Sequence, residues 1–179
     1  TTEMVRKMRE GVDGWGNTNW YDKVCGTGTR QHHNLSASGG NDKIHFFTSI
    51  GYLEEKGNID KYNYKRYNLR SNIDAKITKG LSLSLGISGR IEDKDEPRFS
   101  ADPDAYMNVP LQSIWAVPYM PETYTFEGKE YNVASLAAGS AVSPLGSIYD
   151  SGYNRKNYSY IQSNFSLTYD APWLKGLSI

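Results

Sequence analysis

The sequence of 179 residues predicts an all-β fold, an antiparallel meander that is a partial segment of a transmembrane β-barrel. Three observations predict it: long segments of alternating apolar and polar residues, very short turns between some of them, and no apolar run of about 18 residues. Successive side chains of a strand point to opposite faces, so alternation separates an apolar face from a polar one. Strands of about 9–11 residues cross a bilayer, whereas globular strands usually end after about six.

The clearest alternation lies in residues 62–92, which we predict to form two strands joined by a very short turn. On one face, residues 67–77 are mostly apolar, and the pattern resumes after residues 78–80. The opposite face of the first strand is polar without exception. We expect this polar row to line an aqueous lumen: Arg66, Asn68, Arg70, Asn72, Asp74 and Lys76.

Two further stretches have strand character. Strands over residues 29–38 and 43–54 bring the number of antiparallel strands within residues 29–92 to four. Residues 155–179 hold another strand to about residue 170, a periplasmic turn and the start of the next strand. Because the chain stops inside that last strand and begins with Thr, we expect it to be a piece of a longer polypeptide.

Two segments without strand periodicity are predicted to be loops. Residues 1–28 should hold a short helix over residues 2–9. Residues 93–154 form a long, partly helical insertion, with a helix over about residues 102–114 and a small hairpin over residues 126–131. Outer-membrane barrels have short periplasmic turns and long extracellular loops, which places residues 1–28, 54–63 and 93–154 outside the cell.

Composition limits the classes of function. The 20 basic side chains balance 20 acidic ones, so there is no reason to propose a nucleic-acid partner. A mean hydropathy of −0.63 does not exclude a barrel, because half of each barrel strand faces water. The 14 Tyr and four Trp, against five Phe, fit a membrane-interface girdle as well as a sugar-binding surface. The single Cys25 excludes an internal disulfide.

Candidate metal ligands are few. His32 and His33 are adjacent on a strand and point to opposite faces, and a third ligand besides His45 is not evident. Four aspartates of the long loop do not have the spacing of an EF-hand: Asp93, Asp95, Asp102 and Asp104. We expect ordinary histidines, a solvated acidic loop and no metal site.

Candidate catalytic residues are equally weak. Nothing places Asp93 and Glu96 in a cleft as an acid and a base. Ser140, Ser143 and Cys25 lack the sequence setting of an activated nucleophile. We therefore expect no enzyme activity and no cofactor.

Several side chains are candidates for contact with a substrate. Aromatic rings stack on sugar rings, and amide groups form hydrogen bonds with hydroxyl groups. The candidates near the barrel mouth and in the long loop are Trp115, Tyr119, Tyr124, Tyr158, Tyr160 and Gln162. An interfacial or packing role for the same aromatic residues is the alternative, and the sequence leaves both open.

Four segments of the chain resemble SusC/RagA-type TonB-dependent transporters, which are outer-membrane proteins of Bacteroidetes. They are NTNWYD at 17–22, HNLSASGGNDK at 33–43, GYLEEKG at 51–57 and YKRYNLRSNID at 64–74. Each segment alone is a weak signal, and the combination is specific. The resemblance is clear over residues 17–91 and weaker through the long loop.

The resemblance implies a 22-stranded, multi-pass barrel with an internal plug in the outer membrane of a Gram-negative cell. It implies import of glycan oligosaccharides or peptides, together with a SusD-like surface lipoprotein and the inner-membrane TonB–ExbB–ExbD complex. The apolar faces of the strands would contact outer-membrane lipid, and the polar row would contact the plug or the transport path. No residue of this chain corresponds to the plug or the TonB box.

Two other functions stay open at this point. A soluble or surface all-β carbohydrate-binding module, such as a lectin-like sandwich, would pack its apolar rows against a second sheet and have strands of about six residues. A passive porin or adhesin barrel would lack the plug. Strand length favours the transporter, whereas the small size and low mean hydropathy favour the module.

Overall fold

The structure is a computed structural model that describes residues 1–98, 109–133, 135–137, 140–171, 173 and 178. The chain forms two compact units. The loop unit comprises Thr1–Thr29, Lys56–Asn63 and Asp95–Arg155, and the sheet unit comprises Arg30–Glu55, Tyr64–Lys94 and Lys156–Ile179. The three segments of the loop unit overlap the three segments that the connection lengths group as loops, although their side of a membrane stays a prediction.

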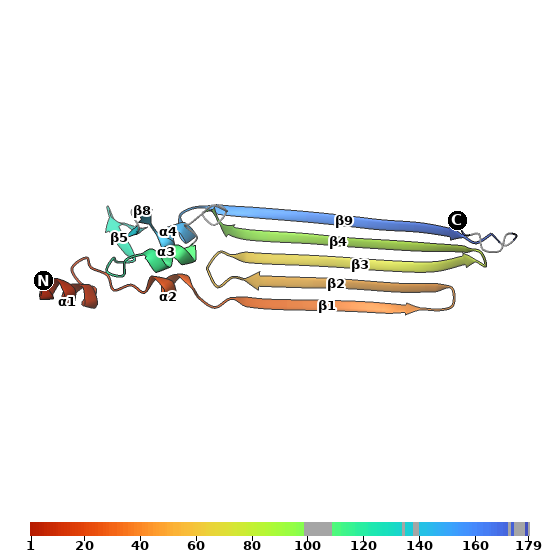
Figure 1. The fold of residues 1–179 in the computed structure, drawn as a ribbon, viewed down its shortest axis with the longest axis horizontal. Helices are drawn as coiled ribbons and strands as arrows, with labels where there is room; N and C mark the ends of the chain where they lie inside the picture. The colour runs from red at the N-terminus through yellow and green to blue at the C-terminus, as the bar shows by residue number, and fades with distance from the viewer. Residues whose placement is uncertain (99–108, 134, 138–139, 172, 174–177, 179) are drawn as a thin grey trace. The chain divides into compact units, whose positions relative to one another are not determined.

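The sheet unit is built on five antiparallel strands in the order β1-β2-β3-β4-β9 (Figure 1). The strands are 12 to 17 residues long. They are β1 (Thr29–Gly40), β2 (Ile44–Lys56), β3 (Asn63–Thr78), β4 (Leu81–Pro97) and β9 (Tyr153–Tyr169). The antiparallel sheet predicted from alternation is confirmed, and β9 pairs with β4 across the long insertion.

The strand ends differ from the predicted ones by a few residues. The largest difference is at β4, which continues to Pro97 into a segment predicted to be loop. Within the sheet unit, Asn157 donates a hydrogen bond to Asp93. Within the loop unit, the Nε atom of Arg155 donates to Asp95 at 2.6 Å. These cross-strand pairs let charged residues extend the ladder, which an apolar count along one strand does not detect.

The two faces of the sheet differ as alternation predicts. On the apolar face, large side chains are exposed along all five strands: Leu35, Ile44, Phe46, Ile50, Leu69, Ile73, Ile87, Ile91, Ile161, Phe165 and Leu167. Ile161 is 86% exposed and Phe165 is 70% exposed, so no second layer of the described chain covers this face. A sandwich would bury these side chains.

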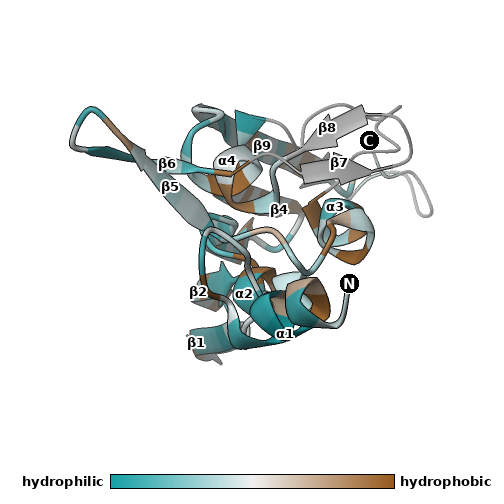
Figure 2. Cartoon of the chain, turned by 90° about the vertical axis from the view of Figure 1, so that its left-hand side faces the viewer, coloured by the Kyte–Doolittle hydropathy of each residue, from teal (hydrophilic) through white to brown (hydrophobic). Residues whose placement is uncertain are grey.

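The described residues of the loop unit form four helices and two small hairpins (Figure 2). The helices are α1 (Thr2–Glu10), α2 (Trp20–Val24), α3 (Val109–Trp115) and α4 (Pro144–Tyr149). The hairpins pair β5 (Thr123–Phe126) with β6 (Lys129–Asn132), and β7 (Ser135–Ala137) with β8 (Ser140–Val142). Of the helix expected over residues 102–114, the structure describes only the part from Val109, because residues 102–108 lie outside the described residues. No helix of the described chain is long and apolar enough to cross a membrane.

A small apolar core holds the loop unit together. Val24 of α2, Val109 of α3 and Ile148 of α4 pack with Ile59, and Leu145 lies against them. Ile148 is only 1% exposed. The core therefore joins all three sequence segments of the loop unit, which is why distant loops form one compact body.

Candidate functional site

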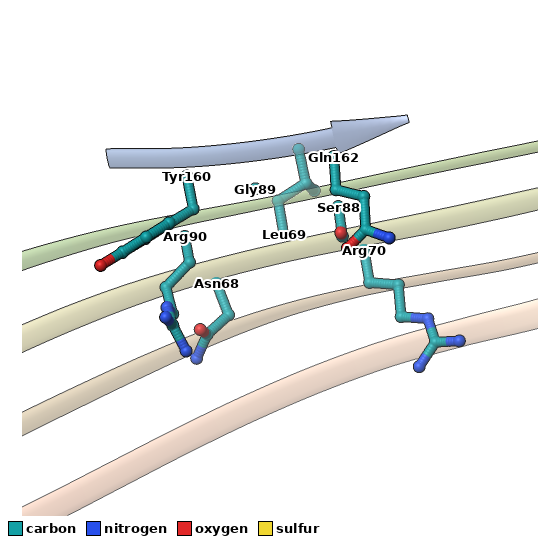
Figure 3. Close-up of a pocket in the computed structure, with 8 residues that line it drawn as sticks. All are labelled: Asn68, Leu69, Arg70, Ser88, Gly89, Arg90, Tyr160 and Gln162. Atoms are coloured by element: carbon teal, nitrogen blue, oxygen red, sulfur yellow. The ribbon is translucent and has the colours of Figure 1, made fainter. Parts of the chain in front are cut away.

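A polar hollow of about 400 Å³ lies on the polar face of the sheet unit (Figure 3). Three adjacent strands each contribute two polar side chains: Asn68 and Arg70 from β3, Ser88 and Arg90 from β4, and Tyr160 and Gln162 from β9. Figure 3 shows these side chains on one side of the sheet, whereas the side chain of Leu69 points to the other. The hollow exists because the polar rows of β3, β4 and β9 fall on the same face.

Arg90 is held in place on two sides. Its guanidinium group lies 4.6 Å from the centre of the Tyr160 ring, within the range of a cation–π contact. Its Nε atom is 3.1 Å from a carboxylate oxygen of Glu92. The ring and the carboxylate therefore orient Arg90 before any ligand arrives.

Four other polar side chains of the hollow have unused hydrogen-bonding capacity. Within the described residues, no hydrogen bond or ion pair is formed by the side chains of Asn68, Arg70, Ser88 or Gln162. Such groups bond to water, to a ligand or to another part of a larger protein. The hollow thus presents guanidinium, amide and hydroxyl groups that are free to recognise polar groups of a ligand.

The rest of the predicted lumen row lies along β3. Ser84 on β4 donates a hydrogen bond of 2.6 Å to Asp74, which ties the two strands together. Asn72 is half-buried and Lys76 is exposed. The Nε atom of Arg66 is buried without a hydrogen-bond partner among the described residues. Two of the six residues, Asn68 and Arg70, thus belong to the hollow itself.

The predicted substrate-contact residues do not form one group. Tyr160 and Gln162 line the hollow, and Tyr158 stacks beside Tyr160 at 6.4 Å between ring centres. In the loop unit, Tyr119 packs against Trp15, and Tyr124 stacks on Tyr131. Trp115 ends α3, and no ring contact joins it to Tyr119 or Tyr124 within the described residues. These separate contacts fit the packing alternative for the loop aromatic residues.

The sequence-based site omitted Ser88 and Arg90. Both lie on the polar row of the strand that follows the predicted lumen row. Applying the same alternation to β4 would have included both residues in the predicted site, because neighbouring strands of a meander pair and share faces.

Metal-ligand clusters are not assembled in the described residues. No group of three or more His, Cys, Asp or Glu side chains in the described part of the chain has the arrangement of a metal site. Asp102 and Asp104 lie outside that part. Ser143 caps α4, accepting from the Gly146 N–H at 3.2 Å and donating to the Val133 carbonyl. Capping is a structural role for this hydroxyl group.

Curated relatives of this chain are receptors of one class. TonB-dependent receptor P3 from Formosa agariphila is 33% identical over 84 residues, which are 47% of this chain and 8% of the receptor. TonB-dependent receptor SusC from Bacteroides thetaiotaomicron is 28% identical over 80 residues, which are 37% of this chain and 8% of SusC. The resemblance to SusC/RagA-type TonB-dependent transporters is confirmed. No family model matches the chain.

Solved structures share the fold of this chain. The RagAB peptide importer in its closed-closed state matches with a TM-score of 0.59 at 17% identity, over 90% of this chain and 18% of that chain. A second RagAB peptide transporter structure matches with a TM-score of 0.57 at 16% identity, over 99% of this chain and 22% of that chain. This chain therefore spans less than a quarter of the length of each of these SusC/RagA-type proteins.

Proposed function

We propose that this chain forms part of the barrel wall and outer loops of a TonB-dependent outer-membrane importer. The observation that carries the proposal is a sheet of long strands with one uncovered apolar face and one polar face. Lipid solvates the apolar face, and the polar face lines an aqueous lumen. Soluble proteins rarely expose a contiguous apolar surface of this kind, which is why a membrane is the natural solvent for it.

The two edges of the sheet agree with a larger barrel. β1 and β9 are edge strands of the described sheet. Unpaired backbone groups are very unfavourable in hydrocarbon, so a sheet in a bilayer must close on itself. In our proposal, further strands of a 22-stranded barrel pair with β1 and β9, and a plug fills the lumen.

The proposed importer works without covalent chemistry. A SusD-like surface lipoprotein and the outer loops would capture an oligosaccharide or a peptide, and the TonB–ExbB–ExbD complex would supply the energy that displaces the plug. The loop unit suits the capture step, because its apolar core fixes three loops against one another. RagAB is described as a peptide importer. Growth experiments would identify the substrate of this chain.

Cysteine labelling of the full-length protein tests the orientation of β3. In a Cys25→Ser background, single cysteines would replace six consecutive residues: Asn68, Leu69, Arg70, Ser71, Asn72 and Ile73. A membrane-impermeant thiol reagent should label the even-numbered positions through the lumen and spare the odd-numbered ones, which face lipid. Equal labelling at all six positions would contradict the barrel assignment.

Growth experiments test import itself. Deleting the full-length gene should abolish growth on at least one glycan or peptide, and the intact gene should restore it. A deletion strain that grows like its parent on every such nutrient would contradict import. The rival soluble module requires a second layer over the apolar face, which the described chain lacks. A folded monomer in detergent-free buffer would support that module instead.

A further inference from the structure

We infer that the polar hollow binds a carboxylate group, so that the transporter takes acidic substrates. This inference rests on the proposed function, because it places the hollow on the wall of the transport path. The hollow is lined by Asn68, Arg70, Ser88, Arg90, Tyr160 and Gln162.

The local charge of the hollow favours an anion. The whole chain is neutral, with 20 basic and 20 acidic side chains. The hollow itself is not neutral, because Arg70 and Arg90 line it and none of its lining residues is acidic, whereas Asp74 and Glu92 lie farther along the same polar rows. This excess of guanidinium groups attracts anions from the aqueous path.

The two guanidinium groups of the hollow differ in whether another residue already engages them. Glu92 pairs with Arg90, and Arg90 is stacked on Tyr160. Arg70 lines the same hollow with no ion pair among the described residues. Its planar guanidinium fork matches a planar carboxylate with two parallel hydrogen bonds. Arg70 is therefore the residue that we expect to hold the anion directly.

Arg66 adds positive charge beside the hollow. It lies two residues before Asn68 on the same row, about 6–7 Å along the strand, and it is not a lining residue. The Nε atom of Arg66 is buried without a hydrogen-bond partner in the described chain, so a ligand in the hollow does not reach that atom. Arg66 therefore raises the local positive potential without contacting the ligand.

A comparison within the molecule supports this choice. A hollow of about 360 Å³ in the loop unit also contains charged side chains, among them Lys61, Asp95 and Arg155. There, Arg155 bonds to Asp95 at 2.6 Å, and Lys61 donates to the Tyr149 carbonyl at 3.2 Å. Those groups are used within the protein, whereas the hollow of the sheet unit keeps a guanidinium free.

Two kinds of substrate carry the same chemistry. A peptide presents carboxylates on Asp, Glu and its C-terminus, and a glycan presents them on uronic acids. The amide groups of Asn68 and Gln162 and the hydroxyl group of Ser88 can bond to the peptide groups or to the sugar hydroxyls beside the carboxylate. The test therefore uses one acidic and one neutral probe of each kind.

The experiment measures binding to the full-length transporter in detergent, with its partner lipoprotein where the complex requires it. The probes are a Glu-containing pentapeptide, its Gln-containing C-terminally amidated counterpart, a galacturonic acid tetramer and a galactose tetramer. We expect the native protein to bind at least one acidic probe. Arg70→Gln should weaken that binding about tenfold. A higher salt concentration should also weaken the binding of the acidic probe to the native protein. Binding of the neutral probes should change less than about twofold. Arg70→Lys should retain part of the affinity.

The matched control is Lys76→Gln. It removes one positive charge from the same polar row of β3, where Lys76 is exposed and lies outside the hollow. We expect no change in the binding of acidic probes. A similar loss in both variants would show a general charge effect and would overturn the inference.

Other outcomes also overturn it. One is that the native protein binds neither acidic probe, and another is that Arg70→Gln weakens the binding of acidic and neutral probes equally. A third is that Arg70→Gln binds the acidic probes as the native protein does, while its plug becomes sensitive to protease. The last result would show that a plug carboxylate, not a substrate, occupies the hollow. Failure of the proposed function is separate, because it appears as loss of the alternating cysteine labelling on β3.

Discussion

The loop unit and the sheet unit place the same residue types in opposite environments. Ile148 in the loop unit is 1% exposed and packs with Val24, Ile59 and Val109. Ile161 in the sheet unit is 86% exposed on a face with no cover from the described chain. Burial stabilises the apolar side chains of the loop unit, whereas the apolar face of the sheet unit is exposed and, in our proposal, meets lipid. The mean hydropathy over the whole chain therefore describes neither unit.

The two units also use hydrogen bonds differently. In the sheet unit the backbone ladder supplies regularity, and side-chain bonds such as Ser84 to Asp74 join neighbouring strands. In the loop unit, side chains join distant segments: the Trp20 indole donates to the Val117 carbonyl at 2.9 Å, and Thr18 donates to the Met120 carbonyl at 3.0 Å. We therefore expect a mutation in the loop unit to loosen contacts between distant loop segments. In our proposal, a charge on the apolar face of the sheet unit acts differently, because it weakens insertion into the membrane.

The largest effect is expected from a charge on the apolar face. Ile73→Lys places an ammonium group near the middle of β3 and should destabilise the inserted full-length barrel by about 3 kcal/mol. The adjacent Asn72→Lys places the same group on the polar face and should change stability by less than about 1 kcal/mol. The fraction of heat-modifiable folded protein in outer membranes measures both. Equal losses would show that both faces meet the same solvent.

The core of the loop unit should be nearly as sensitive. Ile148→Ala leaves a cavity beside Val24, Ile59 and Val109 and should cost about 2–3 kcal/mol of local stability. Ile114→Ala in α3 removes the same atoms from a side chain that is 65% exposed, and should cost less than about 1 kcal/mol. Hydrogen exchange of loop amides in the full-length protein compares the two variants. Matching exchange rates would deny that this core holds the loops together.

A backbone contact in the loop unit predicts a smaller effect. A Cβ atom on Gly16 would lie 2.1 Å from the Met120 carbonyl oxygen, so Gly16→Ala must displace one of two paired segments. We expect a loss of about 1–2 kcal/mol, seen as faster proteolysis of the loops. Gly26→Ala is the control, because its nearest contact would be 3.7 Å away. Similar proteolysis of both variants would contradict the close approach of residues 16 and 120.

The smallest effect concerns Tyr149, whose hydroxyl group donates a hydrogen bond to Asp60. This bond, with burial and the nearby charge, raises the pKa of Tyr149 to about 12 from its ordinary value of 10.0. Tyr149→Phe should cost about 0.5–1 kcal/mol, because the pair is half-exposed and water screens it.

The pH dependence of that contact follows from the direction of the pKa shift. Below pH 10 the hydroxyl keeps its proton in both folded and unfolded chains, and the contribution is complete. Between pH 10 and about 12 the unfolded chain loses the proton first, so the contribution falls as pH rises. Loop hydrogen exchange in native and Tyr149→Phe proteins should therefore converge over this interval. A constant difference would show that the bond to Asp60 does not govern the titration.

Prediction from sequence succeeded where the signal is local. The alternation around Arg66, Asn68 and Arg70 predicted a strand with a polar face, because side-chain direction in a strand depends only on position along it. Prediction was weaker at β4, because the partners that hold its charged end in the ladder lie some 60 residues away on β9. The short turn at Glu127 and Gly128 was recognised, since positive φ angles favour Gly there.

Sequence alone therefore determined that the chain makes long strands with two unlike faces, because the alternation of apolar and polar residues is local to each strand. Only the tertiary structure decided that Tyr160 and Gln162 lie beside Asn68, Arg70 and Arg90, since the register of β9 on β4 is set across a long insertion. It also decided that Ile59 meets Ile148 in the loop unit's core. Contacts between distant segments depend on how the whole chain packs, which no local pattern records.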